Sequence, residues 1–187
     1  MADDKEEDTL EIISDEYLAL LQKYRLSHPD WGSTARKHSD KVASIASAHG
    51  VKTILDFGCG TGTLAAALKG KGYKITKYDP AVADFDLLPE QQFDMVVCID
   101  VMEHVEEQFA QAVINLCLDK ADKCVYFYIS CVPAKAVLPD GRNAHITLLD
   151  PRTWLVYLRR EDYKIGMFNW TEKFAEYVGI KLNKPES

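Results

Sequence analysis

Residues 51–69 constrain the fold of this chain more than any other stretch. An apolar, β-branched run at 51–55 is typical of a strand, and residues 64–69 are rich in strong helix formers. Three glycines stand between them at alternate positions: Gly58, Gly60 and Gly62. Glycine tolerates positive φ and lets a ligand lie directly on the backbone, and a helix N-terminus attracts anionic groups. The pattern predicts a strand, a glycine turn and a helix that together bind a ligand.

The rest of the chain alternates between segments of strand and helix character. Helices are expected at about 11–25, 34–49, 62–69, 105–118 and 151–160. Strands are expected at 53–56, 73–78, 93–99 and 124–130, and two further extended segments at 164–170 and 173–182. This order predicts an α/β fold with a Rossmann-like, doubly wound and mostly parallel sheet. We expect helices on both faces of the sheet and an antiparallel hairpin at its edge.

Charge and cysteine content limit the classes of protein to consider. The net charge of −7 argues against a large electrostatic footprint for nucleic acid. Residues 1–9 are predicted to be a disordered acidic tail, and 10–187 a single globular domain. Five cysteines without a CxxC pair predict reduced thiols in a cytoplasmic protein. An acidic start argues against a signal peptide, and no apolar run is long enough to cross a bilayer.

The spacing of the glycines narrows the choice of cofactor. Nicotinamide and flavin enzymes use G-x-G-x-x-G, whereas this chain has G-x-G-x-G. A P-loop is excluded because no Gly-Lys-Ser/Thr follows the turn.

Three motifs in order resemble those of class I S-adenosylmethionine-dependent methyltransferases. Asp56-Phe57-Gly58-Cys59-Gly60-Thr61-Gly62 looks like the D-x-G-C-G-T-G signature of that family. Tyr78-Asp79-Pro80 resembles the acidic end of its second strand, and 93–105 resembles its F-D-x-V…E-H-V segment. The resemblance covers about residues 50–132. It implies that 51–187 form the cofactor-binding domain and that helices within 10–50 cover the site.

The resemblance implies a set of cofactor contacts. Asp56 would orient the glycine turn and receive the ammonium of the cofactor. Asp79 would accept both ribose hydroxyls, since a carboxylate offers two acceptor oxygens. Asp84 would contact the adenine amino group, with Asp86 as its rival, and Phe85 would form a wall of the adenine pocket. The full predicted set is Asp56, Gly58, Cys59, Gly60, Thr61, Asp79, Pro80, Asp84, Phe85, Ile99, Asp100 and Val101.

The chain departs from the family at residues 80–92. The family usually has a helix, a strand and their loops in this position, and here there is no room for them. We therefore expect one strand and helix unit to be shortened or missing, with a more open adenine pocket.

Residues that act on the methyl acceptor are expected at the same rim of the sheet. Glu103, His104 and His145 are the candidates for a catalytic base or substrate handle. Trp31, Arg142, Asn143 and His145 are the candidates for substrate binding, and His38 is expected at the surface. Three alternatives stay open: helix capping by Glu103 and His104, an ordinary solvated turn at 138–146, and helix packing by Trp31.

These features predict a methyltransferase that acts on a small molecule, with S-adenosylmethionine as methyl donor and S-adenosylhomocysteine as product. DNA is not expected as substrate, because 100–103 read Asp-Val-Met-Glu in place of the [DNS]-P-P-[YF] motif of DNA amino-methyltransferases. No membrane partner is expected. No metal is expected either, because no His, Asp and Glu set has ligand spacing along the chain. The alternatives are a cofactor-binding protein without methyl transfer, such as a regulatory subunit, and an RNA or protein methyltransferase that needs a partner.

Overall fold

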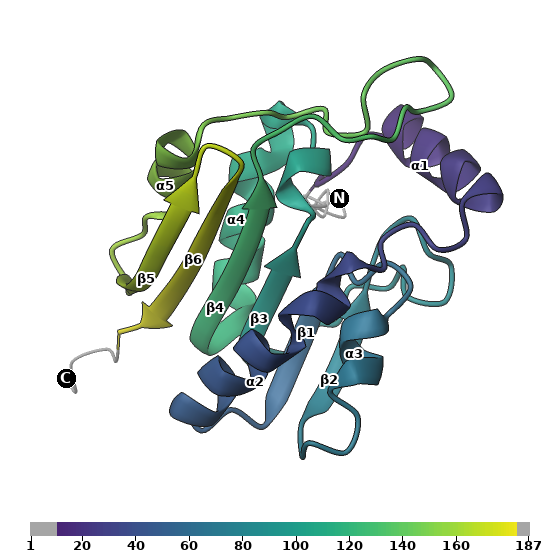
Figure 1. Ribbon diagram of the computed structural model, residues 1–187. Coiled ribbons are helices and arrows are strands. Elements are labelled where there is room, and N and C mark those ends of the chain that lie inside the picture. The colour runs from purple at the N-terminus through teal and green to yellow at the C-terminus, as the bar shows by residue number, and fades with distance from the viewer. Residues whose placement is uncertain (1–10, 183–187) are drawn as a thin grey trace, which may run out of the picture.

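A computed structural model describes residues 11–182, in which six strands form one sheet of order β2-β1-β3-β4-β6-β5 (Figure 1). The strands are β1 (Thr53–Phe57), β2 (Lys74–Tyr78), β3 (Phe93–Ile99), β4 (Ala121–Ser130), β5 (Tyr163–Thr171) and β6 (Phe174–Lys181). The first four are parallel to one another. β6 is antiparallel to β4, and β5 completes the hairpin at the edge. The predicted α/β architecture with an antiparallel edge hairpin is confirmed.

The helices follow the predicted order but begin and end at different residues in places. They are α1 (Asp15–Ser27), η1 (Thr34–His38), α2 (Ser39–Ala48), α3 (Thr63–Ala67), η2 (Met102–His104), α4 (Glu107–Lys120) and α5 (Pro151–Leu158). The first helix starts at Asp15 and not at 11, because the Ser14 side chain accepts a hydrogen bond from the Tyr17 N–H and caps it. The predicted helix 34–49 is a 3-10 turn that continues into α2. The acidic tail predicted at 1–9 lies outside the described residues.

Helices cover both faces of the sheet, as predicted. Alternate residues of β3 point to opposite sides: Met95 and Val97 pack with α2 and α3, whereas Val96 and Cys98 pack with α4 and α5. In Figure 1, α2 and α3 lie in front of the sheet and α4 lies behind it. This double burial explains why β3 is almost continuously apolar.

Residues 80–92 contain turns but no helix or strand. This confirms the prediction that one strand and helix unit is shortened or missing here. β2 is therefore the edge strand on this side and pairs only with β1. Without this unit, the residue that follows β2, Asp79, contacts Arg25 of α1 and Gly60 of the glycine turn.

α1 and the loop 131–150 lie together beyond the carboxyl ends of β3 and β4 (Figure 1). A third apolar cluster joins them, in which Tyr17, Leu21 and Tyr24 of α1 pack with Leu138 and Ala144 of the loop. None of the helices in residues 11–182 has both the length and the apolar character needed to cross a bilayer.

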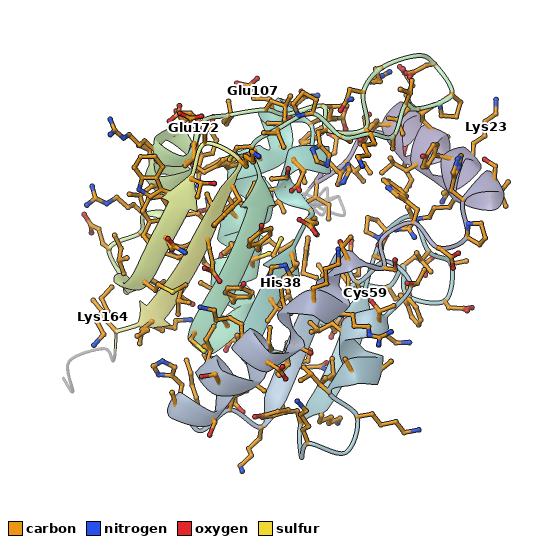
Figure 2. The ribbon with its side chains drawn as sticks, in the orientation of Figure 1. Lys23, His38, Cys59, Glu107, Lys164 and Glu172 are labelled. Atoms are coloured by element: carbon orange, nitrogen blue, oxygen red, sulfur yellow. The ribbon has the colours of Figure 1, made fainter. Side chains whose placement is uncertain are left out.

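His38 is more buried than we expected. Its Nδ1 lies 3.0 Å from the Tyr126 hydroxyl, and its ring packs on Tyr128 with centroids 4.3 Å apart. Figure 2 shows the side chain over the front face of the sheet. The expectation of a surface position was wrong because η1 turns this side of the segment toward the strands.

Candidate functional site

A cavity of about 490 Å³ lies at the carboxyl edge of the parallel strands, beneath α1 and the loop 131–150. The chain segments that follow β1, β2, β3 and β4 all contribute to its wall. Ligands of open α/β sheets bind at this edge. The lining includes Ile12, Ile13, Leu21, Arg25, Trp31, Gly32, Thr34, Phe57, Gly58, Gly60, Asp79, Pro80, Ala81, Asp100, Val101, His104, Val105, Ser130, Pro133, Ala134, Lys135, Ala136 and His145.

The glycine turn forms one wall of the cavity, and its conformation requires glycine. Gly58 and Gly60 have φ of 71° and 54°. A Cβ on Gly58 would lie 2.3 Å from a Val101 methyl carbon, and a Cβ on Gly60 would lie 2.4 Å from the Gly32 carbonyl oxygen. The turn is therefore held between the end of β3 and the segment after α1, with bare backbone toward the cavity.

Asp79 follows β2 and is 6% exposed. Its Oδ2 accepts hydrogen bonds from the Gly60 N–H at 2.9 Å and from the Arg25 guanidinium at 2.8 Å. Its Oδ1 accepts one from the Ala81 N–H at 3.0 Å. The carboxylate therefore links the glycine turn, the end of β2 and α1, and Oδ1 keeps capacity for a further donor.

Replacing Arg25 with Ala is expected to lower the free energy of unfolding by about 1–3 kcal/mol, because it removes a charged hydrogen-bond donor from the largely buried Asp79 carboxylate. The pair is largely buried, with side-chain exposures of 16% and 8%. Urea unfolding of the two proteins measures the change. Lys23→Ala is the matched control on the same helix, since the Lys23 side chain points to solvent (Figure 2). An equal loss in both variants would contradict a specific role for the ion pair.

Asp56, at the end of β1, is buried, and its Oδ2 has no hydrogen-bond partner within the described residues. Burial raises the pKa of its carboxyl to about 7, and the Asp79 charge adds to this effect while Lys77 opposes it. The pKa of Asp56 therefore depends on the charges around the glycine turn. Its side chain does not contact the cavity in this conformation.

The stability contributed by Asp56 is expected to fall as pH rises. The folded carboxyl has a pKa near 7, and the unfolded one about 3.9, so the folded protein keeps a proton that the unfolded chain has released. The Asp56→Asn variant should therefore gain roughly 2–3 kcal/mol relative to wild type between pH 5 and pH 8. Urea unfolding at both pH values measures this difference, with the exposed Asp84→Asn as control. A difference that is constant with pH would contradict the raised pKa.

The end of β3 contributes a strained backbone position. Among the described residues, Asp100 is the one non-glycine residue with positive φ, at 53°. Its N–H donates to the Tyr128 carbonyl at 2.8 Å, and its Oδ2 accepts from the Thr34 hydroxyl at 2.6 Å. Such a conformation costs about 1 kcal/mol or more, and residues that adopt it cluster at functional sites. Asp100 and Val101 line the cavity, while Ile99 is buried beneath them.

Two histidines and a glutamate meet at the far side of the cavity. His104 Nδ1 lies 2.6 Å from the Ala144 carbonyl oxygen, and His145 Nδ1 lies 2.6 Å from the Val132 carbonyl oxygen. A carbonyl oxygen only accepts, so both Nδ1 atoms carry the hydrogen, and in a neutral imidazole Nε2 then keeps a lone pair. Burial, with the nearby His145, lowers the pKa of His104 to about 4.

Glu103 lies beside these histidines and is fully buried. Its Oε1 accepts a hydrogen bond from the Ser130 N–H at 3.0 Å, whereas its Oε2 has no partner among the described residues. Burial raises the pKa of this carboxyl well above its usual range. Ligand atoms of Glu103, His104 and His145 all lie within 4.8 Å of one another. The sequence did not predict this cluster, because the three residues lack ligand spacing along the chain. His145 comes from a separate loop and joins the other two only in the folded structure.

A family profile described as "Methyltransferase domain" matches residues 31–165, which is most of the chain. The chain belongs to the class I S-adenosylmethionine-dependent methyltransferases. No curated protein sequence is a significant match to this methyltransferase.

Solved structures share the fold of this methyltransferase at low sequence identity. The 1,6-didemethyltoxoflavin-N1-methyltransferase of Burkholderia thailandensis, solved with 1,6-didemethyltoxoflavin and S-adenosylhomocysteine, is 15% identical over 90% of each chain, with a TM-score of 0.65. A methyltransferase from Clostridium acetobutylicum has a TM-score of 0.61 at 13% identity, covering 91% of this chain and 100% of that one. The magnesium protoporphyrin IX methyltransferase of Synechocystis has a TM-score of 0.57 at 17% identity, covering 78% and 83%.

The structure brings part of the predicted cofactor set to the cavity of the methyltransferase. The predicted residues at the cavity wall are Gly58, Gly60, Asp79, Pro80, Asp100 and Val101. Cys59 is buried and Thr61 is exposed, and neither side chain reaches the cavity. The turn therefore presents its backbone, and the side chains between its glycines point elsewhere.

Asp84 and Phe85, which we predicted to contact the adenine, do not line the cavity. Asp84 is exposed to solvent, and the Phe85 ring packs beneath the Lys77 ammonium at 3.5 Å. Because 80–92 form turns in place of a helix and strand, this segment folds back so that the Phe85 carbonyl accepts the Asp79 N–H at 2.9 Å. Pro80 and Ala81 line the cavity in their stead.

The predicted substrate residues separate into two groups. Trp31 and His145 line the cavity, and the Trp31 ring meets His104 edge-on with centroids 5.3 Å apart. Arg142 lies outside it and pairs with Asp140 and with Glu16 of α1, and its guanidinium lies over the Tyr17 ring.

Asn143 also lies outside the cavity and supports the loop. Its amide exchanges two hydrogen bonds with the backbone of Ala134, and its Oδ1 also accepts the His145 N–H at 2.9 Å. Arg142 and Asn143 thus hold α1 and the loop in place, because their polar groups are already paired with neighbouring chain.

The cavity is also lined by Arg25, Gly32 and segment 133–136, to which sequence reasoning assigned no individual role. Arg25 follows Leu21 by four residues and therefore shares the inward face of α1. The sequence signal that could have identified Arg25 as a site residue is a cation on an otherwise apolar helix face. Segment 133–136 carries no comparable signal, because its position depends on the Asn143 hydrogen bonds.

Proposed function

We propose that this methyltransferase binds S-adenosylmethionine in the cavity and transfers its methyl group to a small molecule. The observation that carries the proposal is the continuity of one cavity, from the glycine turn and Asp79 on one side to His104 and His145 on the other. One end suits a charged nucleoside-type cofactor and the other an acceptor, so donor and acceptor would meet near Asp100 and Val101.

The cofactor half is supported by backbone and carboxylate chemistry. The glycine turn offers bare backbone to the methionine part of the cofactor, and Asp79 Oδ1 retains acceptor capacity for a ribose hydroxyl. For Asp79 to bind both ribose hydroxyls, the Arg25 guanidinium must release Oδ2. Solved relatives of the same fold hold S-adenosylhomocysteine or S-adenosylmethionine.

The lining of the acceptor half favours a small substrate. This half is bordered by α1 and the loop 131–150, which pack on each other. The surrounding residues are mostly apolar, among them Ile12, Leu21, Trp31 and Val105. In two relatives of the same fold the named substrates are also small molecules, 1,6-didemethyltoxoflavin and magnesium protoporphyrin IX.

The transfer itself needs alignment more than functional groups from the protein. A lone pair of the acceptor attacks the methyl carbon in line with sulfur, the carbon–sulfur bond breaks, and S-adenosylhomocysteine remains. Because its pKa is near 4, His104 is a weak base at neutral pH and is better suited to position an acceptor than to remove its proton.

Calorimetric titration with S-adenosylhomocysteine tests the donor half, and we expect one site per chain. Incubation of the full chain with methyl-labelled S-adenosylmethionine and a cell extract tests the acceptor half. Label should enter the small-molecule fraction and stay out of the protein and nucleic-acid fractions. No binding by the folded protein would refute the cofactor assignment. Label in a macromolecular fraction, or binding without transfer, would refute the small-molecule assignment.

A further inference from the structure

The cluster of Glu103, His104 and His145 has the composition of a metal site. Two of the residues come from η2 after β3 and one from the loop after β4, and their ligand atoms lie within 4.8 Å of one another. Two atoms that each lie about 2.1 Å from one ion are at most about 4.2 Å apart. Small movements of the side chains would therefore close the three groups around an ion.

Both imidazoles are already held in the form that binds metals. The Nδ1–H groups donate to the backbone carbonyls of Ala144 and Val132, each at 2.6 Å, which leaves Nε2 as the free donor of an electron pair. Histidine ligands in metal sites usually make such a bond to a carbonyl or carboxylate, because it fixes the tautomer and the ring orientation. Trp31 packs on the His104 ring and restricts it further.

Glu103 supplies an independent observation. The residue is 0% exposed, and its Oε2 is buried without a partner, although its Oε1 accepts from the Ser130 N–H. None of the ion pairs within residues 11–182 involves Glu103, and the Arg25 guanidinium, whose charge acts on His104, is bonded to Asp79. A buried carboxyl oxygen without a partner is costly, and a cation at that position would satisfy it.

We propose that Glu103, His104 and His145 bind one divalent first-row transition-metal ion, through the glutamate carboxylate and the two Nε2 atoms. Two nitrogen ligands and one carboxylate favour Zn²⁺, Fe²⁺, Co²⁺ or Mn²⁺ over Mg²⁺ and Ca²⁺, which prefer oxygen ligands. Three protein ligands leave coordination positions open, and His104 and His145 both face the cavity.

The open positions give the ion a role that rests on the proposed methyl transfer. An acceptor hydroxyl bound to the ion would have a lower pKa and would release its proton to water. Its oxygen would then form a bond to the methyl carbon as the electron pair of the methyl–sulfur bond returns to sulfur. The ion would thus activate the acceptor hydroxyl for transfer.

Titration of the chelator-treated full chain with Co²⁺ tests the site, because the visible absorption of Co²⁺ reports its ligands. All samples carry Cys131→Ser, since Cys131 is the one cysteine that is not buried. Wild type should bind one equivalent, and Glu103→Gln and His145→Gln should each weaken binding at least about 10-fold. His49→Gln is the control, because His49 lies at the opposite end of the sheet beside Lys181. Zn²⁺ should displace Co²⁺, and Mg²⁺ should not.

Separate titrations with S-adenosylhomocysteine distinguish this inference from the proposed function. We expect His145→Gln to lose Co²⁺ binding and to keep S-adenosylhomocysteine binding. If Glu103→Gln does not fold, judged by circular dichroism, His104→Gln replaces it. No stoichiometric Co²⁺ binding by wild type, equal affinity in wild type and the variants, or displacement by Mg²⁺ would each overturn the metal site.

Discussion

Replacing Asp79 with Asn is expected to weaken binding of S-adenosylhomocysteine by at least about 100-fold, because hydrogen bonds to a charged acceptor are worth about 1.5–3 kcal/mol each. Asp79 is the acidic residue at the end of β2 that lines the cavity, and it is positioned by the Gly60 and Ala81 N–H groups. Asparagine keeps the shape of the side chain but removes the charge and one acceptor oxygen. Calorimetric titration of both proteins measures the loss.

Two control variants separate the proposed ribose contact from other effects. Asp84→Asn removes an acidic residue that is exposed and outside the cavity, so S-adenosylhomocysteine should bind it as tightly as wild type. Arg25→Ala breaks the same ion pair from the other side while it leaves the Asp79 carboxylate intact. If Asp79→Asn bound as tightly as wild type, the ribose contact would be refuted. If Arg25→Ala lost as much affinity as Asp79→Asn, the ion pair and not the carboxylate would be responsible.

The fold could be predicted because its signals are local. β3 is nearly continuously apolar as it is buried on both faces, and each glycine or proline turn falls between two periodic segments. Element ends were less predictable, because they depend on contacts such as the Ser14 cap. The shortened 80–92 segment was visible as a count of residues, but its folding back onto Asp79 was not.

The two halves of the candidate site differ in how much the sequence could reveal. The glycine turn and Asp79 follow directly after strands, so their position at the carboxyl edge follows from the order of elements. The acceptor side depends on the path of the loop 131–150. Arg142 and His145 are three residues apart, yet one pairs with α1 at the surface and the other lines the cavity. Which of them points inward depends on the Asn143 hydrogen bonds, the His145–Val132 hydrogen bond and the Arg142 ion pairs, none of which follows from the order of elements.

Gly58→Ala is expected to lower the free energy of unfolding by about 2–5 kcal/mol. Left-handed backbone costs an alanine about 1–2 kcal/mol, and forcing a methyl group into a packed site adds about 1–3 kcal/mol. Gly58 has φ of 71°, and its new Cβ would lie 2.3 Å and 2.9 Å from the two Val101 methyl carbons. Because Val101 lines the cavity, displacing its side chain would also disturb the place where we propose that methyl donor and acceptor meet. Urea unfolding gives the stability change.

The two causes can be measured separately. Gly70 also has positive φ, at 81°, but an added Cβ there meets nothing within 4 Å, so Gly70→Ala reports the backbone cost alone. Val101→Ala removes the two methyl carbons that clash. The double variant Gly58→Ala, Val101→Ala should be more stable than the sum of the single changes predicts by about 1–3 kcal/mol. Strict additivity would mean that Gly58 is needed only for its backbone conformation, and that the packing of β3 against the glycine turn does not restrict this position.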